Sequence, residues 1–421
     1  MSEVYNQTQN GGLKCQEEDH LFAFDCTVML SEPNSTTHSR TSAQLQHSDC
    51  SLTTLSIVHH PSARCSYLSL RPVSGHAPPT MKAIALQKDF VKHISDLAVS
   101  DVPAPTSSSS EILVNIAYAA IQHVDLLYAR GLHQNNHIGL VAPPFILGLE
   151  YSGVVASAPA GSKFKKGDRV FGGGVGAFAE QYVAKESQLS LVPESWSLRE
   201  AAGVGSAAHV SYGAIIRCGQ LRPGETILIH AAAGGLGIMA CQIALAIGAR
   251  VIATVGSTAK MDVVRRLGVR DVISYDTEGW EKEVLKLADG KGVDLVYDTV
   301  GLVQKSISCT RFRGRVVIAG FAGRGGEMEK LAMNRVLLKN VQLLGYRYGE
   351  TGRRDPAENV LVSEDVARMI KEGAIKPVIY DEVYEGLESV PRALADSASR
   401  KIWGKGVVDV QPHLDQRRSK L

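Results

Sequence analysis

Closely spaced glycines between an apolar strand and an apolar helix carry the clearest chemical signal in this sequence. The strand pattern covers 226–230, and helical periodicity of apolar residues follows the glycines. Small residues let a backbone turn tightly and approach a phosphate, and the N-terminus of the next helix faces its charge. The segment therefore predicts the pyrophosphate-binding turn of a dinucleotide fold. Its residues are Ala233, Gly234, Gly235, Leu236 and Gly237.

The second strand of this unit, 250–255, ends without an acidic residue. In NAD enzymes a carboxylate about twenty residues past the glycines binds the ribose 2′-hydroxyl. Ser257 and Lys260 stand in this region instead, and the ammonium of Lys260 can attract a 2′-phosphate. The pattern favours NADPH over NAD. Capping of the next helix by Ser257 or Thr258, with Lys260 solvated, is a compatible alternative.

The composition is that of an ordinary globular protein, with 44% hydrophobic and 21% charged residues and a net charge of +2. No run of lysine or arginine indicates a nucleic-acid partner. No apolar run approaches the ~20 residues of a membrane span. The seven cysteines form no CxxC pair, which favours free thiols in a reducing compartment. We therefore expect a cytoplasmic protein that binds neither nucleic acid nor membrane.

Residues 1–80 differ in pattern from the rest of the chain. They are rich in Ser and Thr and hold no hydrophobic period. Acidic residues argue against a mitochondrial presequence, and no signal-peptide core is present. We expect either a disordered extension or an artefact of the gene model, because Met81 opens the ordered pattern as a translation start would.

The rest of the chain divides by strand pattern. Strands are expected at 111–117, 150–156 and 169–172, and then alternate with helices at 226–230, 250–255, 271–274, 293–297 and 314–320. Alternation at this spacing predicts a parallel sheet. A helix near 362–372 and strand-like 378–380 and 406–410 follow. We expect a catalytic domain begun by 81–200, a dinucleotide-binding domain at 201–340, completion of the first domain by 341–410, and a tail at 411–421.

Six segments resemble the medium-chain dehydrogenase/reductase superfamily and, more narrowly, its quinone oxidoreductase branch, which includes zeta-crystallin. They are 81–83, 148–153, 166–170, 231–237, 297–301 and 337–340. The resemblance covers about 81–410. It implies an α/β fold in which a doubly wound parallel Rossmann sheet is inserted in a GroES-like β-rich catalytic domain. It also implies NADPH in the cleft between the domains and a homodimer.

Zinc-dependent members of this superfamily need a Cys after the first long strand and a His in a Gly-His-Glu motif, because Zn²⁺ takes such ligands at tetrahedral spacing. The corresponding positions here read Gln122-His123 and Gly148-Leu149-Glu150. His123 and Glu150 are two candidate ligands without a third. We therefore expect no metal site.

Without a Lewis acid, the substrate must be electrophilic by itself. A quinone or an α,β-unsaturated ketone accepts hydride and spreads the charge over a conjugated enolate, whereas nothing would lower the pKa of a saturated alcohol. Positioning and electrostatics would then supply most of the acceleration. The expected function is NADPH-dependent reduction of a quinone or enone, with tailoring in secondary (polyketide) metabolism as one branch. The alternatives are a zinc-type alcohol dehydrogenase and a non-enzymatic NADPH-binding relative.

Three residues are the catalytic candidates that the resemblance implies. Gln122 occupies the position of an Asn near the nicotinamide and the substrate carbonyl. Asp125 matches an Asp of the same motif, with a helix N-cap as the alternative role. His133 falls where relatives carry a Tyr that lines the substrate cleft. With a pKa near neutral it could supply the proton that follows hydride, and an exposed loop histidine is the alternative.

The remaining cofactor candidates lie further along the chain. Ligands bind at the carboxyl ends of the strands in such sheets, which points to Gly301 after the fourth strand and to Phe321 and Ala322 after the fifth. By resemblance, Tyr275 lies beside the adenosine, with surface packing as the alternative. Lys405 matches a basic position near the NADPH phosphates, with a solvated surface lysine as the alternative. Arg347 is left open between a cofactor contact and a dimer edge.

Overall fold

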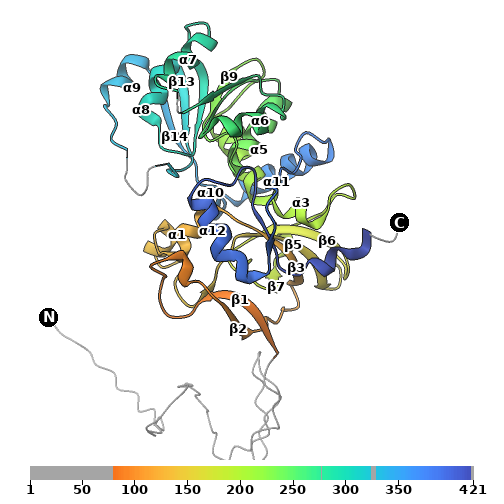
Figure 1. Ribbon diagram of the computed structural model, residues 1–421. Coiled ribbons are helices and arrows are strands. Elements are labelled where there is room, and N and C mark those ends of the chain that lie inside the picture. The colour runs from red at the N-terminus through yellow and green to blue at the C-terminus, as the bar shows by residue number, and fades with distance from the viewer. Residues whose placement is uncertain (1–78, 276, 324–328, 419–421) are drawn as a thin grey trace, which may run out of the picture. The chain divides into compact units, whose positions relative to one another are not determined.

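The computed structural model describes residues 79–275, 277–323 and 329–418 (Figure 1). Apart from Pro79 and Thr80, the residues for which a disordered extension or a gene-model artefact was expected lie outside this range. The first strand begins at Thr80, one residue before the expected start of the ordered pattern.

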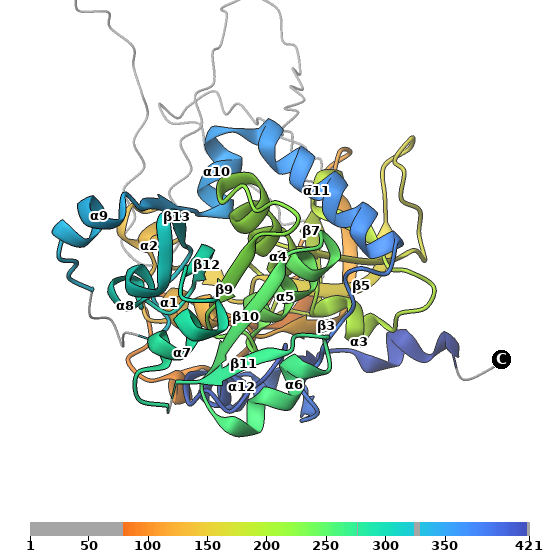
Figure 2. The same cartoon turned by 90° about the horizontal axis from the view of Figure 1, so that it is seen from above.

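A six-stranded parallel sheet forms the dinucleotide-binding domain, in the order β11-β10-β9-β12-β13-β14. This is the doubly wound Rossmann order, and Figure 2 shows β9, β10 and β11 side by side. Alternate residues of the central strand enter separate cores, Ile227 and Ile229 on one face and Leu228 on the other. Burial on both faces explains why the strands read as continuous apolar runs. The strands are β9 Thr226–Ile229, β10 Arg250–Val255, β11 Asp271–Ser274, β12 Val293–Asp298, β13 Thr310–Ile318 and β14 Gln342–Gly345.

Helices cover both faces of this sheet. Residues of α4, α5 and α11 share one core with β9 and β10, whereas α7 and α8 pack into the other. The helices of this domain are α4 Gly205–Tyr212, a π-helix Gly213–Cys218, α5 Gly235–Ala246, a 3₁₀ turn Thr258–Lys260, α6 Met261–Arg265, α7 Trp280–Leu287, α8 Val303–Cys309 and α9 Asn334–Lys339.

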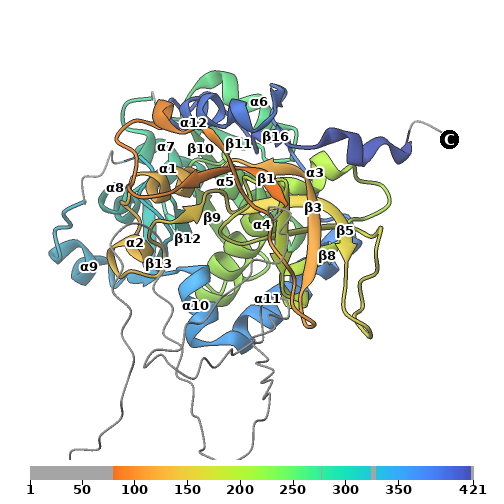
Figure 3. The ribbon, with the colours of Figure 1, turned by 90° about the horizontal axis from the view of Figure 1, so that it is seen from below.

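A largely antiparallel sheet forms the GroES-like catalytic domain, in the order β15-β16-β3-β5-β6-β8 with β7 also paired to β3 (Figure 3). A smaller sheet has the order β2-β1-β4. Because β16 pairs with β3, the C-terminal segment returns to the first domain after the Rossmann unit. The strands are β1 Thr80–Leu86, β2 Val99–Pro103, β3 Ile112–Ala120, β4 Phe145–Ile146, β5 Glu150–Ser157, β6 Arg169–Gly173, β7 Gln181–Ala184, β8 Leu189–Leu191, β15 Tyr384–Glu385 and β16 Val407–Asp409.

The remaining helices lie in the segments before β9 and after β14. They are α1 His123–Ala129, α2 Gln134–His137, α3 Leu198–Ala202, α10 Tyr348–Arg354, α11 Pro356–Lys371 and α12 Val390–Ala398, with 3₁₀ turns at Ile94–Asp96, Glu186–Gln188, Leu387–Ser389 and Pro412–Arg418. No helix within the described ranges is long and apolar enough to cross a bilayer.

The fold class expected from the sequence is confirmed, whereas the bounds of several elements differ: the strand expected at 314–320 covers Thr310–Ile318, and that expected at 111–117 covers Ile112–Ala120. The helix expected at 362–372 begins at Pro356, because Asp355 accepts a hydrogen bond from the Glu358 amide and proline suits the first helical turn. The strand-like segment 378–380 makes only an isolated bridge, Ile379 to Lys405.

Candidate cofactor and substrate site

The turn after β9 has the geometry that a pyrophosphate requires. Ala231 adopts a left-handed φ of 49°, and the Gly234 amide donates to the Ala231 carbonyl over 2.8 Å. A Cβ on Gly237 would lie 2.3 Å from the same carbonyl oxygen, so only glycine lets α5 start this close to the strand. The twelve-residue helix α5 then presents its N-terminal amides at the turn. The turn therefore fits a dinucleotide.

Tyr275 supports this turn. Its hydroxyl oxygen accepts a hydrogen bond of 2.8 Å from the Ala231 amide. Burial raises the pKa of its phenol, and its ring lies edge-on to Trp280. The Tyr275 hydroxyl thus holds the backbone of Ala231, the residue with the left-handed φ, in place. Contact between Tyr275 and adenosine stays a prediction.

Two cations lie close together after β10. The Lys260 ammonium donates to the carbonyl oxygens of Arg400 (2.6 Å) and Ile402 (2.9 Å). Burial and the Arg400 guanidinium lower the pKa of Lys260. Ser257 is half-buried and makes no capping hydrogen bond, so its hydroxyl is available to a ligand. Within the described ranges no carboxylate forms an ion pair with either cation.

Arg400 was not among the residues chosen from the sequence. It comes about 140 positions after Lys260 and has no local motif. Its proximity to Lys260 is visible only in the three-dimensional structure, where the segment after α12 lies next to the end of β10. Its φ of 60° is left-handed, which turns this segment toward the Rossmann domain.

A buried ion pair lies within the catalytic domain, beside the glycine turn. The Lys405 ammonium lies 2.7 Å from Oε2 of Glu150, and their side chains are 6% and 1% exposed. The Gly404 amide donates to the Ala233 carbonyl, and a Cβ on Gly235 would lie 2.6 Å from Cδ of Lys405. Lys405 is therefore next to the turn and is not the solvated lysine of the alternative interpretation.

The two carboxylate oxygens of Glu150 are fully engaged. Oε1 accepts from the Ser206 amide (2.6 Å), and Oε2 accepts from Nε2 of Gln122 (3.1 Å) as well as from Lys405. The Gln122 carboxamide is thus oriented by the same carboxylate that neutralises the lysine.

Asp125 is the third residue of helix α1 and is fully buried. Its Oδ2 accepts a hydrogen bond of 2.7 Å from the amide of Gln122, which is the N-cap of α1, so Asp125 completes a capping box and is not itself the N-cap that the alternative named. Its Oδ1 has no hydrogen-bond partner. Burial raises the pKa of Asp125 to about 7, against the lowering effects of the Gln122 bond and Lys405. Asp125 therefore titrates near neutral pH.

The donors at the two motif positions do not fit a zinc ion. Glu150 is buried and paired with Lys405, whereas the side chain of His123 is exposed. No cluster of three or more His, Cys, Asp or Glu side chains that could hold a metal occurs in the described part of the chain. An ammonium group, rather than a metal, satisfies the carboxylate at this position.

His133 caps α2. Its Nδ1 accepts from the Asn135 amide (3.1 Å), and its ring stacks on Tyr128 with centroids 4.3 Å apart. Burial, Arg347 and Arg353 lower the pKa of His133 to about 4. The expectation of a near-neutral pKa was wrong, because burial disfavours the charged imidazolium and two guanidinium groups oppose a further positive charge. His133 is therefore neutral at pH 7 and is poorly suited to deliver a proton as imidazolium.

The carboxyl ends of β12 and β13 lie side by side. Buried Asp298 accepts hydrogen bonds from the amides of Val300, Gly301 and Leu302, which shapes the loop after β12. The Ala322 amide donates to the Thr299 carbonyl across to the neighbouring strand end. Phe321 is 41% exposed here and offers an apolar ring at the predicted nicotinamide position.

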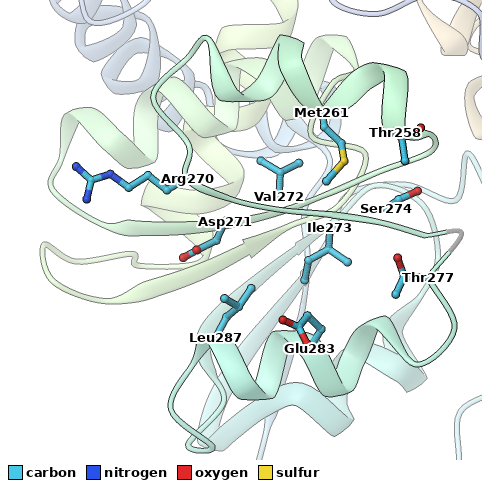
Figure 4. A pocket seen from close by; sticks show the side chains of 10 residues that line it. All are labelled: Thr258, Met261, Arg270, Asp271, Val272, Ile273, Ser274, Thr277, Glu283 and Leu287. Atoms are coloured by element: carbon cyan, nitrogen blue, oxygen red, sulfur yellow. The ribbon is translucent and has the colours of Figure 1, made fainter.

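A cavity of about 370 Å³ runs along the outer edge of β11, between α6 and α7 (Figure 4). At one end it is lined by Thr258 and Ser274, which follow and end β10 and β11. Adenosine binds near these strand ends in dinucleotide folds. The other end reaches Arg270 and Asp271 and lies away from the glycine turn.

Comparison with known proteins agrees with this arrangement. The family model for the alcohol dehydrogenase GroES-like domain matches residues 108–194, and that for the zinc-binding dehydrogenase matches 235–363. Quinone oxidoreductase-like protein 2 of Bos taurus is 33% identical over 324 residues, which are 75% of this chain and 89% of that protein. The chain belongs to the medium-chain dehydrogenase/reductase superfamily, in its quinone oxidoreductase-like branch.

Further members of this branch show the same likeness. A quinone oxidoreductase of Pseudomonas aeruginosa is 32% identical over 308 residues, 71% of this chain and 90% of that protein. The structure of Escherichia coli quinone oxidoreductase complexed with NADPH superposes with a TM-score of 0.67 at 26% identity, covering 79% of this chain and all of the other. This chain is accordingly an oxidoreductase whose Rossmann domain fits a pyridine nucleotide.

Proposed function

We propose that this chain is an NADPH-dependent oxidoreductase that transfers hydride to a quinone or an α,β-unsaturated carbonyl without zinc. The observation that carries the choice of cofactor is the pair of cations Lys260 and Arg400 around Ser257, in a place where NAD enzymes carry an acid. A 2′-phosphate would neutralise both. The NADPH complex of the E. coli quinone oxidoreductase supports the same choice.

The residues of the chain would divide the work as follows. The glycine turn and α5 bind the pyrophosphate, Lys260 and Arg400 hold the 2′-phosphate, and the strand ends with Gly301, Phe321 and Ala322 enclose the nicotinamide. When bound, NADPH supplies the hydride. Gln122, oriented by Glu150, positions the substrate carbonyl region.

Proton control is the remaining task of the site. We propose that Asp125, whose pKa lies at about 7, governs the pH dependence of turnover through the buried network of Gln122, Glu150 and Lys405. His133 is neutral in this range and acts as a wall of the cleft together with Tyr128.

A homodimer in the cytoplasm completes the proposal. Exposed apolar side chains gather at α9: Met333 at its N-cap is 67% exposed, and Leu337 and Leu338 within it are 80% and 73% exposed. A second copy would cover them. The described cysteines, Cys218, Cys241 and Cys309, are free thiols, which suits a reducing compartment.

One titration and one assay test the function. Binding of NADPH and NADH is followed by nucleotide fluorescence, and turnover is measured with 1,4-naphthoquinone, with and without EDTA. We expect tighter NADPH binding and reduction that EDTA leaves unchanged. A preference for NADH, or loss of activity with EDTA that zinc restores, would contradict the proposal. Binding of NADPH without turnover of any quinone or enone in a panel would support a non-enzymatic relative. If turnover is found, the identity of the best substrate in that panel tests the tailoring role in secondary metabolism.

A further inference from the structure

Two arginines, one at the N-cap of α10 and one within it, face the helix pair α1–α2 of the catalytic domain. Nη2 of Arg347 and Nη2 of Arg353 both lie 3.3 Å from Oδ1 of Asn135. Asn135 in turn donates from Nδ2 to the hydroxyl of Tyr128 over 2.6 Å. Two guanidinium groups thus converge on one neutral oxygen at the wall that His133 and Tyr128 form. We call Arg347 and Arg353 the arginine pair.

The arginine pair carries more positive charge than its surroundings neutralise. Arg347, Arg353 and Arg354 share one carboxylate, that of Glu350. This excess positive charge acts on His133, because both members of the pair lower its pKa. Their side chains remain 46% and 41% exposed, so an incoming anion can reach them.

The loop next to the arginine pair is apolar and exposed. Leu132, Ile138 and Leu140 are 50%, 64% and 53% exposed and flank Asn135 in the chain. An apolar surface beside two cations suits a molecule with an apolar body and an anionic group. A guanidinium donates two parallel hydrogen bonds to a carboxylate or a phosphate, which a neutral carbonyl cannot match.

We propose that the substrate of this reductase carries a carboxylate or phosphate group that binds the arginine pair. The inference rests on the proposed function, because it takes the wall formed by His133 and Tyr128 as part of the substrate cleft. The conjugated carbonyl would lie toward Gln122, and the apolar body would cover the loop of Leu132 and Ile138. The anion would replace the Asn135 oxygen as the acceptor of both guanidinium groups.

Matched substrates test this in the full chain. trans-3-Benzoylacrylic acid and its methyl ester present the same enone with and without a charge, and NADPH oxidation reports turnover. We expect kcat/KM for the acid to exceed that for the ester by roughly five- to tenfold, as for a partly exposed charge-assisted pair. Arg347→Ala and Arg353→Ala should each remove most of this preference by raising KM for the acid, with turnover of the ester retained. Arg347→Lys should keep part of it.

Arg368→Ala is the control, because Arg368 is similarly exposed on α11 and also pairs with an acid three residues away. Benzoate and phenyl phosphate are compared as competitive inhibitors of ester reduction, and the stronger one identifies the anionic group. The NMR titration of His133 should shift to higher pH in Arg347→Ala whatever the substrate. Equal reduction of acid and ester that no variant alters would overturn this inference alone, whereas failure to reduce 1,4-naphthoquinone as well would overturn the proposed function.

Discussion

At the scale of single residues, the site is defined by where charge is neutralised and where it is not. Glu150 and Lys405 neutralise each other in the buried interior, next to the glycine turn. Lys260 and Arg400 do not, because they donate to carbonyl groups rather than to acids. Unneutralised cations bind anions, and buried pairs hold elements together. The first pair joins opposite charges, whereas the second consists of two cations, which is why we propose an anion only at the second.

The unneutralised pair leads to a prediction about the cofactor. Arg400→Ala should weaken NADPH binding by about tenfold and leave NADH binding nearly unchanged, because the lost charge-assisted bonds involve only the 2′-phosphate. Dissociation constants from nucleotide fluorescence check this. Arg265→Ala, a similarly exposed arginine on the neighbouring helix α6, is the control. Equal weakening for both nucleotides would place Arg400 outside the phosphate subsite.

Asp125 leads to a prediction about pH. The folded state raises the pKa of Asp125 from 3.8 to about 7, so the folded chain holds a proton that the unfolded chain releases. Stability from this group is complete below pH 4 and is lost as the pH rises through 7. Asp125→Asn mimics the protonated form. Its melting temperature should therefore fall less between pH 5 and pH 8 than that of the wild type. Asp262→Asn, at an exposed carboxylate, should follow the wild-type profile. Parallel profiles for wild type and Asp125→Asn would refute the assignment.

At the scale of elements, strands were easier to predict than the segments that meet at the site. The strands at 250–255 and 271–274 match their predicted bounds, since apolar runs between turn residues are read directly from sequence. The glycine turn was predictable for the same local reason. Arg400, the Glu150–Lys405 pair and the arginine pair were not, because each depends on residues far apart in the chain. The pKa of His133 was mispredicted for the same reason, because its burial and the guanidinium groups of Arg347 and Arg353, which lie far along the chain, leave no local trace in the sequence.

The glycine turn can be tested as an element. Gly237→Ala places a Cβ 2.3 Å from the Ala231 carbonyl oxygen and 2.5 Å from Cα of Ala232, both of them backbone atoms. We expect a loss of about 1–3 kcal/mol in the free energy of unfolding, as for other overpacked sites, and severe loss of NADPH binding. Gly349→Ala, within α10 and with open space at its Cβ, should leave NADPH binding unchanged and should not lower the free energy of unfolding. Denaturant unfolding and NADPH titration measure the two effects, and unchanged values for Gly237→Ala would mean that the turn relaxes.

At the scale of the whole molecule, the exposed apolar side chains of α9 predict the oligomeric state. The wild type should elute with a light-scattering mass twice that of one chain. Leu337→Glu combined with Leu338→Glu should shift it to the monomer, since burying two carboxylates in an apolar interface is unfavourable. Val360→Glu, at another exposed apolar position on α11, should leave the mass unchanged. A monomeric wild type would contradict the proposed dimer. A double variant that stays dimeric would show that the interface lies elsewhere.

The return of residues 400–406 to the glycine turn also limits how the chain can be recombined. In this short segment the Gly404 amide donates to the Ala233 carbonyl, the Arg400 carbonyl accepts from Lys260, and Lys405 pairs with Glu150. The segment nevertheless follows the Rossmann unit by some sixty positions in the chain. A chimera that exchanges only the nucleotide-binding module would therefore place the donor's glycine turn against the recipient's residues 400–406, which are not complementary to it. A working hybrid should carry two inserts from the donor, the module itself and this distant stretch.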